Sequence, residues 1–222
     1  LYCVGHEAFV TEKDLVDGKC PDHQKAPETI EQENWFFKLS RYQEEIKDAI
    51  ETDRLKIIPE SRKNEILSFI VSGLEDVSFS RPKKDLPWGI PVPHDPEQNM
   101  YVWCDALANY ITAIDYAEED KKFKKWWPAD VQVIGKDILR FHAAIWPGML
   151  LSAGLPLPKS LFVHGFITVE GGKMSKTVGN VIDPEELVKK YGVDAVRYYL
   201  LREVSSHEDG DFSIKKFEDR YN

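Results

Sequence analysis

The chain has 222 residues, 42% of them hydrophobic and 12% aromatic, so it can bury a sizeable core in one or two domains. Its formal net charge of −9 argues against a general basic coat for nucleic acid, although a local basic site is compatible with it. We expect no membrane span, because no long apolar run occurs, and no signal peptide at the first residues. Three cysteines without such a signal favour a reducing, cytoplasmic compartment.

Two cysteine–histidine pairs stand in the polar, turn-rich first 30 residues. Cys3 and His6 form one C-x2-H pair, and Cys20 and His23 form a second after thirteen intervening residues. This spacing is typical of structural zinc, in which each knuckle supplies two ligands and four ligands complete a tetrahedron. We therefore predict that these four side chains hold Zn²⁺. The alternative is a pair of thiols and two surface histidines without a metal.

Strand-like and helix-like segments alternate after a proline-rich loop at residues 85–99. Before the loop we predict a short strand followed by a helix within 34–51, and a further helix at 61–74. After it we predict strands at 100–104, 131–135 and 160–169 and helices at 105–114, 137–151, 183–191 and 194–204. Asp105 and Asp183 are the expected N-caps, and Pro147 should disturb its helix. This order predicts an α/β fold with a parallel sheet, whose ligands bind at the carboxyl ends of the strands.

The loop GGKMSKTVGN, residues 171–180, follows the last predicted strand and falls at that edge. Its glycines lower the cost of bending, and Lys173 and Lys176 stand three positions apart. Two point charges on a bendable loop suit a polyphosphate, whereas the simpler alternative is a solvated turn. A Walker A loop is excluded, because Met174 stands where that motif needs Ser or Thr.

The same loop carries a family resemblance. The residues KMSKT followed by VGNVIDP resemble the KMSKS signature of class I aminoacyl-tRNA synthetases, and more narrowly the methionyl-tRNA synthetase family. The resemblance extends over essentially the whole chain through VHGF, GKDILRFH, YVW and DAL upstream and YGVDAVRYYLLRE downstream. It departs from the family at Thr177, where the signature has Ser, and at His6, where one branch has Cys.

The resemblance implies a domain organisation. Residues 1–80 would be a connective insertion that carries the zinc knuckle, residues 81–208 the second half of a Rossmann-type catalytic domain, and residues 209–222 the start of a stem-contact region. It also implies an internal fragment, without the family's HIGH-containing first half and its anticodon-binding domain. We expect such a fragment to be inactive alone.

The resemblance also assigns roles to individual residues. Lys173, Met174, Ser175 and Lys176 would act on the pyrophosphate as the catalytic loop, while ATP would be bound by Gly135, Asp137, His164, Gly165 and Lys176. The methionine side chain would lie against Trp103, Ala106, Tyr110 and His142. From the residues alone, core packing is as good an explanation of the aromatic set, and a helix N-cap is an alternative for Asp137.

The implied activity is that of a methionine–tRNA ligase. Methionine and ATP, with Mg²⁺, would give methionyl-adenylate, and tRNA(Met) would then take the methionyl group in the cytoplasm. One alternative is a class I synthetase for leucine, isoleucine or valine, although these usually carry a larger editing insertion. Another is a non-catalytic zinc-knuckle module that binds RNA or a partner protein.

Overall fold

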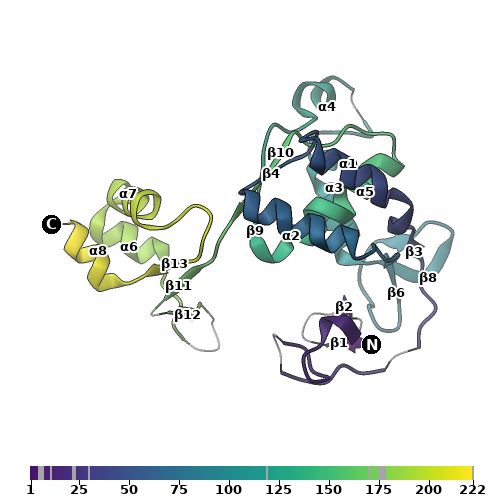
Figure 1. Cartoon of the computed structure of the whole chain (residues 1–222), viewed down its shortest axis with the longest axis horizontal. Coiled ribbons are helices and arrows are strands. Elements are labelled where there is room, and N and C mark those ends of the chain that lie inside the picture. Colours follow the sequence, from purple (N-terminus) through teal and green to yellow (C-terminus); the bar gives the residue numbers. More distant parts are fainter. Residues whose placement is uncertain are drawn as a thin grey trace. The chain divides into compact units, whose positions relative to one another are not determined.

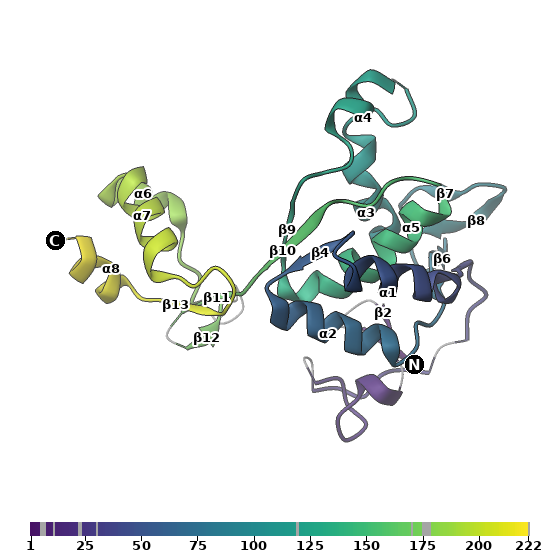
Figure 2. The ribbon, with the colours of Figure 1, turned by 45° about the horizontal axis from the view of Figure 1, so that its top comes forward.

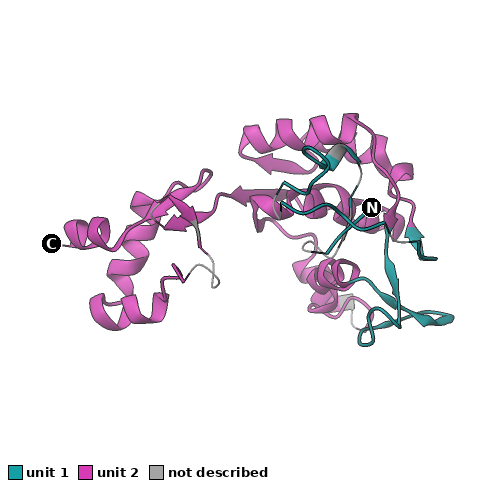
Figure 3. Cartoon of the chain, turned by 90° about the horizontal axis from the view of Figure 1, so that it is seen from below, with its two compact units in different colours: residues 1–36, 78–101 teal, residues 37–77, 102–222 magenta. Residues whose placement is uncertain are grey.

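The computed structural model describes residues 1–4, 8–10, 12–21, 24–29, 31–118, 120–169, 171–174 and 179–221. The chain divides into two compact units, which Figure 3 colours separately. Unit 1 comprises residues 1–36 and 78–101, and unit 2 comprises residues 37–77 and 102–222. These units are defined by compactness, so the domain boundaries implied near residues 80 and 208 stay a prediction.

A three-stranded parallel sheet lies in unit 2 (Figures 1 and 2). Its strands follow the order β4 (Lys56–Ile58), β10 (Ser160–His164) and β9 (Gln132–Gly135). Both neighbouring pairs are parallel, and Gly135 stands opposite His164 in the register. The carboxyl ends of β9 and β10 therefore lie at one edge, and the predicted α/β class with a parallel sheet is confirmed.

Helices pack with this sheet around one hydrophobic cluster. The helices are α1 (Gln43–Glu51), α2 (Glu60–Val71), α3 (Val102–Thr112), α4 (Asp120–Trp126) and α5 (Trp146–Ser152). On α1, the buried residues Ile46, Ala49 and Ile50 have the spacing of a single helical face. They join Leu161 and Val163 of β10 in the cluster, so helices and sheet share one core.

The last part of unit 2 has its own sheet and cluster. Strand β11 (Ile167–Val169) pairs antiparallel with β12 (Gly172–Lys173) and parallel with β13 (Gly210–Phe212). Helices α6 (Pro184–Tyr191), α7 (Val193–Glu203) and α8 (Ile214–Tyr221) accompany it. Their buried cluster consists of Leu187, Val196, Tyr199, Phe212 and Phe217. The predicted N-cap of α6 is confirmed, because the Asp183 carboxylate accepts a hydrogen bond of 2.8 Å from the N–H of Glu185.

Unit 1 consists of short strands and loops. It holds β1 (Tyr2–Cys3) paired with β2 (Ala8–Phe9), a 3-10 turn at Glu12–Asp14, and a sheet of β6 (Ser80–Pro82), β8 (Asp95–Met100) and β7 (Pro91–Val92). Strands β3 (Phe36–Phe37) and β5 (Val77–Ser78) lie where the chain passes between the units. Among the described residues, neither hydrophobic cluster contains a member of unit 1.

The predicted strand at 100–104 and loop at 85–99 were wrong. Strand β8 occupies Asp95–Met100, and α3 already begins at Val102. Trp103 therefore lies inside the helix, and Asp105 stands in its first turn and not at its N-cap. A short apolar run fits a strand or one face of a helix equally well, and packing on the core decided for the helix.

Two other predicted elements are interrupted. The predicted strand at 160–169 divides at Gly165–Phe166 into β10 and β11, which belong to different sheets. The predicted helix at 137–151 is a 3-10 turn at Lys136–Ile138, a π-helical turn at Phe141–Ile145, and then α5. Pro147 closely follows the π-helical turn, and the backbone is helical on both sides of it. A proline inside a helix has no N–H to donate to the preceding turn, and the irregular part lies in that turn.

Among the helices of the described ranges, none combines the length and the apolar character that crossing a bilayer requires.

Candidate functional site

Three of the four residues predicted to bind an amino-acid side chain meet in an aromatic cluster. Trp103 and Tyr110 come from α3, and His142 comes from the π-helical turn. The His142 ring stands edge-on to Trp103, with centroids 6.5 Å apart, and to Tyr110, with centroids 5.7 Å apart. Ala106 is exposed and, by helical spacing, falls on the same face of α3 between Trp103 and Tyr110.

Hydrogen bonds fix the protonation of His142. Its Nδ1 lies 3.0 Å from the carbonyl oxygen of Ile138, which can only accept, so Nδ1 carries a proton. Its Nε2 lies 3.0 Å from Tyr110 Oη, and in the neutral ring it accepts the phenolic proton. Burial lowers the pKa of His142, which is only 2% exposed, and the Ile138 bond opposes this in part. Neutral imidazole is therefore the form that the site favours.

Two further aromatic side chains complete the cluster, and the sequence analysis did not single them out. Phe141 stacks on Trp103 with ring centroids 3.9 Å apart, and Trp146 lies 6.0 Å from the Tyr110 ring. The π-helical turn brings Phe141 and His142 together against α3, and the apolar spacing of an ordinary helix does not distinguish such a turn. A neutral, polarizable and largely aromatic surface of this kind suits an apolar or thioether side chain.

The four non-loop residues predicted to bind ATP lie together at the carboxyl edge of β9 and β10. Gly135 ends β9 opposite His164, which ends β10, and Gly165 follows directly. Asp137 is exposed inside the 3-10 turn whose N-cap is Gly135, so the alternative of Asp137 as an N-cap is wrong. A Cβ at Gly135 would come within 2.7 Å of Asp137 Oδ1, the end of an exposed side chain, so a larger residue there would push the Asp137 carboxylate aside.

The predicted catalytic loop is described only in part. Lys173 ends β12, where its backbone pairs with Thr168 of β11, and the half-buried Met174 follows. Ser175 and Lys176 lie outside the described residues. The base of the loop is thus a tight β-hairpin whose turn residue Gly171 has a φ of +75°, a conformation that favours glycine.

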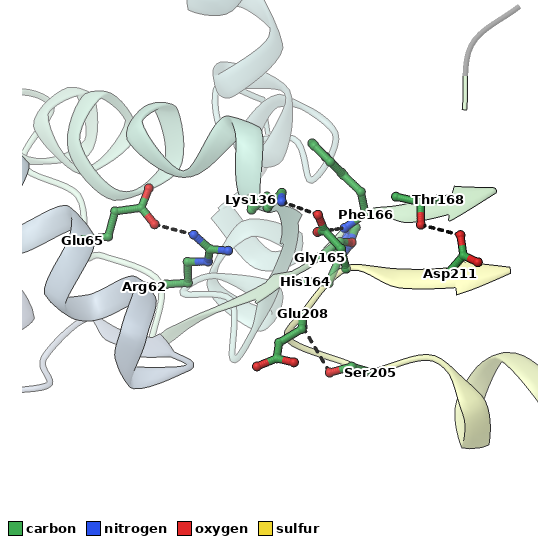
Figure 4. A network of polar contacts seen from close by, with 11 residues as sticks. Arg62, Glu65, Lys136, His164, Gly165, Phe166, Thr168, Ser205, Glu208 and Asp211 are labelled. Atoms are coloured by element: carbon green, nitrogen blue, oxygen red, sulfur yellow. Dashed lines mark hydrogen bonds and ion pairs between the residues drawn. The ribbon is translucent and has the colours of Figure 1, made fainter. Parts of the chain in front are cut away.

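Two carboxylates that the sequence analysis did not single out contact these elements (Figure 4). Asp209 accepts hydrogen bonds from Lys136 Nζ at 2.7 Å and from the N–H of Phe166 at 2.9 Å. Asp211 accepts from Thr168 Oγ1 at 2.9 Å and from the N–H of Gly171 at 2.7 Å. These donors lower the pKa of both carboxyl groups, led by Lys136 for Asp209 and by Gly171 for Asp211.

The predicted zinc ligands fall partly outside the described residues. Cys3 and Cys20 are both buried, whereas His6 and His23 are not among the residues that the structure describes. Cys20 lies in a turn closed by the N–H of Gln24, which donates to the Cys20 carbonyl at 2.8 Å. Within the described ranges, no group of three or more His, Cys, Asp or Glu side chains could hold a metal ion. The zinc site stays a prediction.

Comparison with protein families matches the chain to one family over nearly its whole length. The family described as "tRNA synthetases class I (M)" matches residues 2–222. The match covers both compact units, and with them the aromatic cluster, the edge of the parallel sheet and the lysine hairpin.

Individual relatives agree with this family match. A methionine–tRNA ligase from Caldanaerobacter subterraneus subsp. tengcongensis is 54% identical over 100% of this chain and 34% of its own length. One from Thermosynechococcus vestitus is 50% identical over 97% of this chain and 42% of its own. The chain therefore spans well under half the length of these curated relatives.

A solved structure superposes closely on the chain. It is Mycobacterium tuberculosis methionyl-tRNA synthetase in complex with methionyl-adenylate. At 44% sequence identity the TM-score is 0.91, and the alignment covers 100% of this chain and 44% of that one.

Proposed function

Since this chain belongs to the class I tRNA synthetases (M), we propose that it serves the reaction of a methionine–tRNA ligase. Methionine attacks the α-phosphorus of ATP through its carboxylate, which gives methionyl-adenylate and releases pyrophosphate. A hydroxyl of the 3′-terminal ribose of tRNA(Met) then attacks the carbonyl carbon of the adenylate and takes the methionyl group, and AMP leaves. Relatives of about 50% identity that carry this name support the proposal, as does the family resemblance of the motifs.

The observation that carries the choice of amino acid is the neutral His142–Tyr110 pair against Trp103. Burial lowers the pKa of His142 and so favours the neutral ring, whose Nε2 lies 3.0 Å from Tyr110 Oη, and the rings offer polarizable faces and edges. Sulfur–aromatic contacts are favourable, so this surface suits a thioether better than a polar side chain. We assign the methionine side chain to Trp103, Ala106, Tyr110 and His142.

The nucleotide is assigned to the edge formed by Gly135, Asp137, His164 and Gly165. Glycines at two strand ends let a ligand approach the backbone, and the exposed Asp137 carboxylate can accept hydrogen bonds from ribose hydroxyls. Lys173, Met174, Ser175 and Lys176 are assigned to the triphosphate. Lysines there would stabilise the charge that develops as pyrophosphate leaves, and Mg²⁺ accompanies ATP in this type of chemistry.

Two related proposals concern the metal and the location. Zn²⁺ held by Cys3, His6, Cys20 and His23 would fit a unit that contributes nothing to either described hydrophobic cluster. The two buried thiols suit such a site chemically. A cytoplasmic location follows from the proposed role in protein synthesis, and it stays a prediction.

Methionine-dependent exchange of pyrophosphate into ATP tests the proposed function. The full-length protein should catalyse exchange with methionine and not with valine, leucine or isoleucine. Lys176→Ala should lower the rate by on the order of 10²–10³, the usual cost of removing one donor that stabilises the transition state. Addition of tRNA(Met) should then give methionyl-tRNA.

The two alternatives predict different results in the same assay. Exchange with valine, leucine or isoleucine in place of methionine would contradict the assignment of the aromatic cluster and indicate another class I synthetase. A folded protein without exchange for any amino acid would contradict the ligase function. It would support a module that binds RNA or a protein without catalysis.

A further inference from the structure

A three-residue segment, Asp209–Asp211, joins two parts of the proposed site. Each of its carboxylates accepts one backbone N–H and one side-chain donor from elements that precede it by 40 residues or more in the sequence. The middle residue, Gly210, donates its own N–H to the carbonyl of Phe166 at 2.9 Å. Figure 4 shows the contacts of this segment at Lys136 and Phe166 and the bond between Thr168 and Asp211.

Asp209 contacts the turn assigned to the nucleotide. Its carboxylate binds Lys136, which stands between Gly135 and Asp137, at 2.7 Å. The Lys136 ammonium also lies 4.7 Å from the centre of the Phe166 ring, and Phe166 donates its N–H to Asp209. The Lys136 side chain is thus held by the Asp209 carboxylate and by the Phe166 ring, and these two partners are hydrogen-bonded to each other.

Asp211 contacts the base of the lysine loop. One carboxylate oxygen, Oδ1, receives both the Thr168 hydroxyl and the N–H of Gly171. Gly171 is the left-handed turn residue of the β11–β12 hairpin, and Lys173 ends that hairpin opposite Thr168. Asp211, which belongs to the neighbouring strand β13, therefore connects β11 of the hairpin with its turn through hydrogen bonds that are additional to the strand pairing.

Packing fixes the segment itself. Phe212 is 3% exposed within the second hydrophobic cluster, which anchors the end of β13. At the other end, a Cβ on Gly165 would come within 2.2 Å of the Glu208 backbone. The backbone at Gly165 and the backbone at Glu208 are therefore already in contact. With both ends held, a shift of the hairpin cannot be absorbed by a shift of the segment.

We propose that Asp209 and Asp211 are positioning residues that hold the base of the lysine loop at a fixed place relative to the Gly135–Asp137 turn. This inference rests on the proposed function, because it assigns the two carboxylates a part in the same activation reaction. The lysines stabilise leaving pyrophosphate only when the loop holds their ammonium groups within reach of the phosphate oxygens. A misplacement of about 1 Å in such a constellation can cost on the order of 10²-fold in rate.

Substitutions at Asp211, made in the full-length protein, test the hairpin half of the proposal. Asp211→Ala removes the acceptor of the Gly171 N–H and should lower kcat of ATP–pyrophosphate exchange by roughly 10- to 100-fold. The KM for methionine should hardly change, because the aromatic cluster is untouched. Asp211→Asn keeps an acceptor oxygen and should restore most of the rate. The matched control is Asp219→Ala, which removes a carboxylate from the same hollow beside Tyr199 and Glu203.

Hydrogen exchange of the backbone provides a readout that does not depend on activity. The amides of residues 168–173 should exchange faster in Asp211→Ala than in the wild type, Asp211→Asn or Asp219→Ala, with little change in the thermal midpoint. Unchanged exchange in Asp211→Ala would overturn the proposal. So would a loss of kcat that Asp211→Asn fails to restore. If the wild type shows no pyrophosphate exchange, the proposed function fails, and amide exchange alone then decides whether Asp211 holds the hairpin.

A double-mutant cycle tests the link to the nucleotide turn. Lys136→Met and Asp209→Asn each break the ion pair, while the amide oxygen that Asp209→Asn introduces can still accept the Phe166 N–H. If the pair acts through its contact, the double variant should lose no more kcat than either single variant. Losses that multiply would show that Lys136 and Asp209 act independently, and would overturn this half of the proposal.

Discussion

The protonation of one buried histidine determines the character of the aromatic cluster. His142 donates from Nδ1 to the Ile138 carbonyl and accepts at Nε2 from Tyr110, so a neutral ring satisfies both contacts. A second proton on Nε2 would reverse the Tyr110 bond and bring a charge to a surface assigned to an apolar chain. Burial disfavours that charge and lowers the pKa of His142.

We therefore predict that methionine affinity falls in mild acid. With the His142 pKa below its ordinary 6.5, the site should bind fully at neutral pH and lose affinity as the pH falls through the lowered value. Folding stability has the same sign, because the unfolded chain takes up the proton at higher pH than the folded one. Methionine binding followed by tryptophan fluorescence between about pH 8 and about pH 5 measures the effect. His142→Gln cannot titrate and should lose the pH dependence, so an unchanged slope in this variant would contradict the assignment.

At the scale of elements, the break between β10 and β11 matters most for the site. Had the strand run straight from residue 160 to 169, the lysine hairpin would continue the parallel sheet. Instead the chain leaves that sheet at Gly165 and Phe166 and begins a second one with β12 and β13. Gly165 permits this because its Cα lies against the backbone of Glu208 and Asp209.

Gly165→Ala should therefore destabilise the protein. The new methyl group would lie 2.2 Å from backbone atoms, which cannot move aside as a flexible side chain can, and overpacking of this kind costs about 1–3 kcal/mol. Gly172→Ala is the matched control, because its Cβ would meet its nearest neighbour, the Val169 carbonyl oxygen, at an ordinary 3.6 Å. Urea unfolding midpoints compare the two. Equal shifts would mean that the contact at Gly165 is not close in solution.

At the scale of the whole molecule, the two units differ in what stabilises them. Both described hydrophobic clusters lie in unit 2. The buried part of unit 1 includes polar side chains such as Ser80, Arg81, Gln98 and Asn99, with Cys3 and Cys20 among its few buried apolar residues. A small unit with little apolar core usually depends on a metal or a partner for stability.

If zinc supplies that stability, its removal should loosen unit 1 and leave unit 2 folded. We expect about one zinc per chain, and chelation or Cys20→Ser should raise hydrogen exchange in residues 1–36 selectively. Cys104→Ser is the control, because Cys104 is a half-buried thiol of α3 in unit 2 and outside the predicted ligand set. Elemental analysis and hydrogen exchange measure both points. A zinc-free protein with a well-protected unit 1 would contradict the predicted site.

The sequence by itself determined the features that depend on short stretches of chain. The alternation of apolar segments predicted the α/β class, and Asp-Pro-Glu at residues 183–185 predicted the start of α6, where the structure has the cap. The motifs around residues 135, 142 and 173 predicted the family, which the match over residues 2–222 confirms. Each of these signals is local, because a cap, a strand period or a signature loop is complete within a few residues.

Only the tertiary structure decided the features that depend on residues far apart. The partner strand β4, the π-helical turn below α3 and the helical state of residues 102–104 follow from packing on a shared core. The contacts of Asp209 with Phe166 and Lys136 join positions 43 and 73 residues apart. An aspartate before a glycine looks like an ordinary loop residue in the sequence. Its role appears only where the fold brings donors to it, because a hydrogen bond depends on distance in space and not on spacing along the chain.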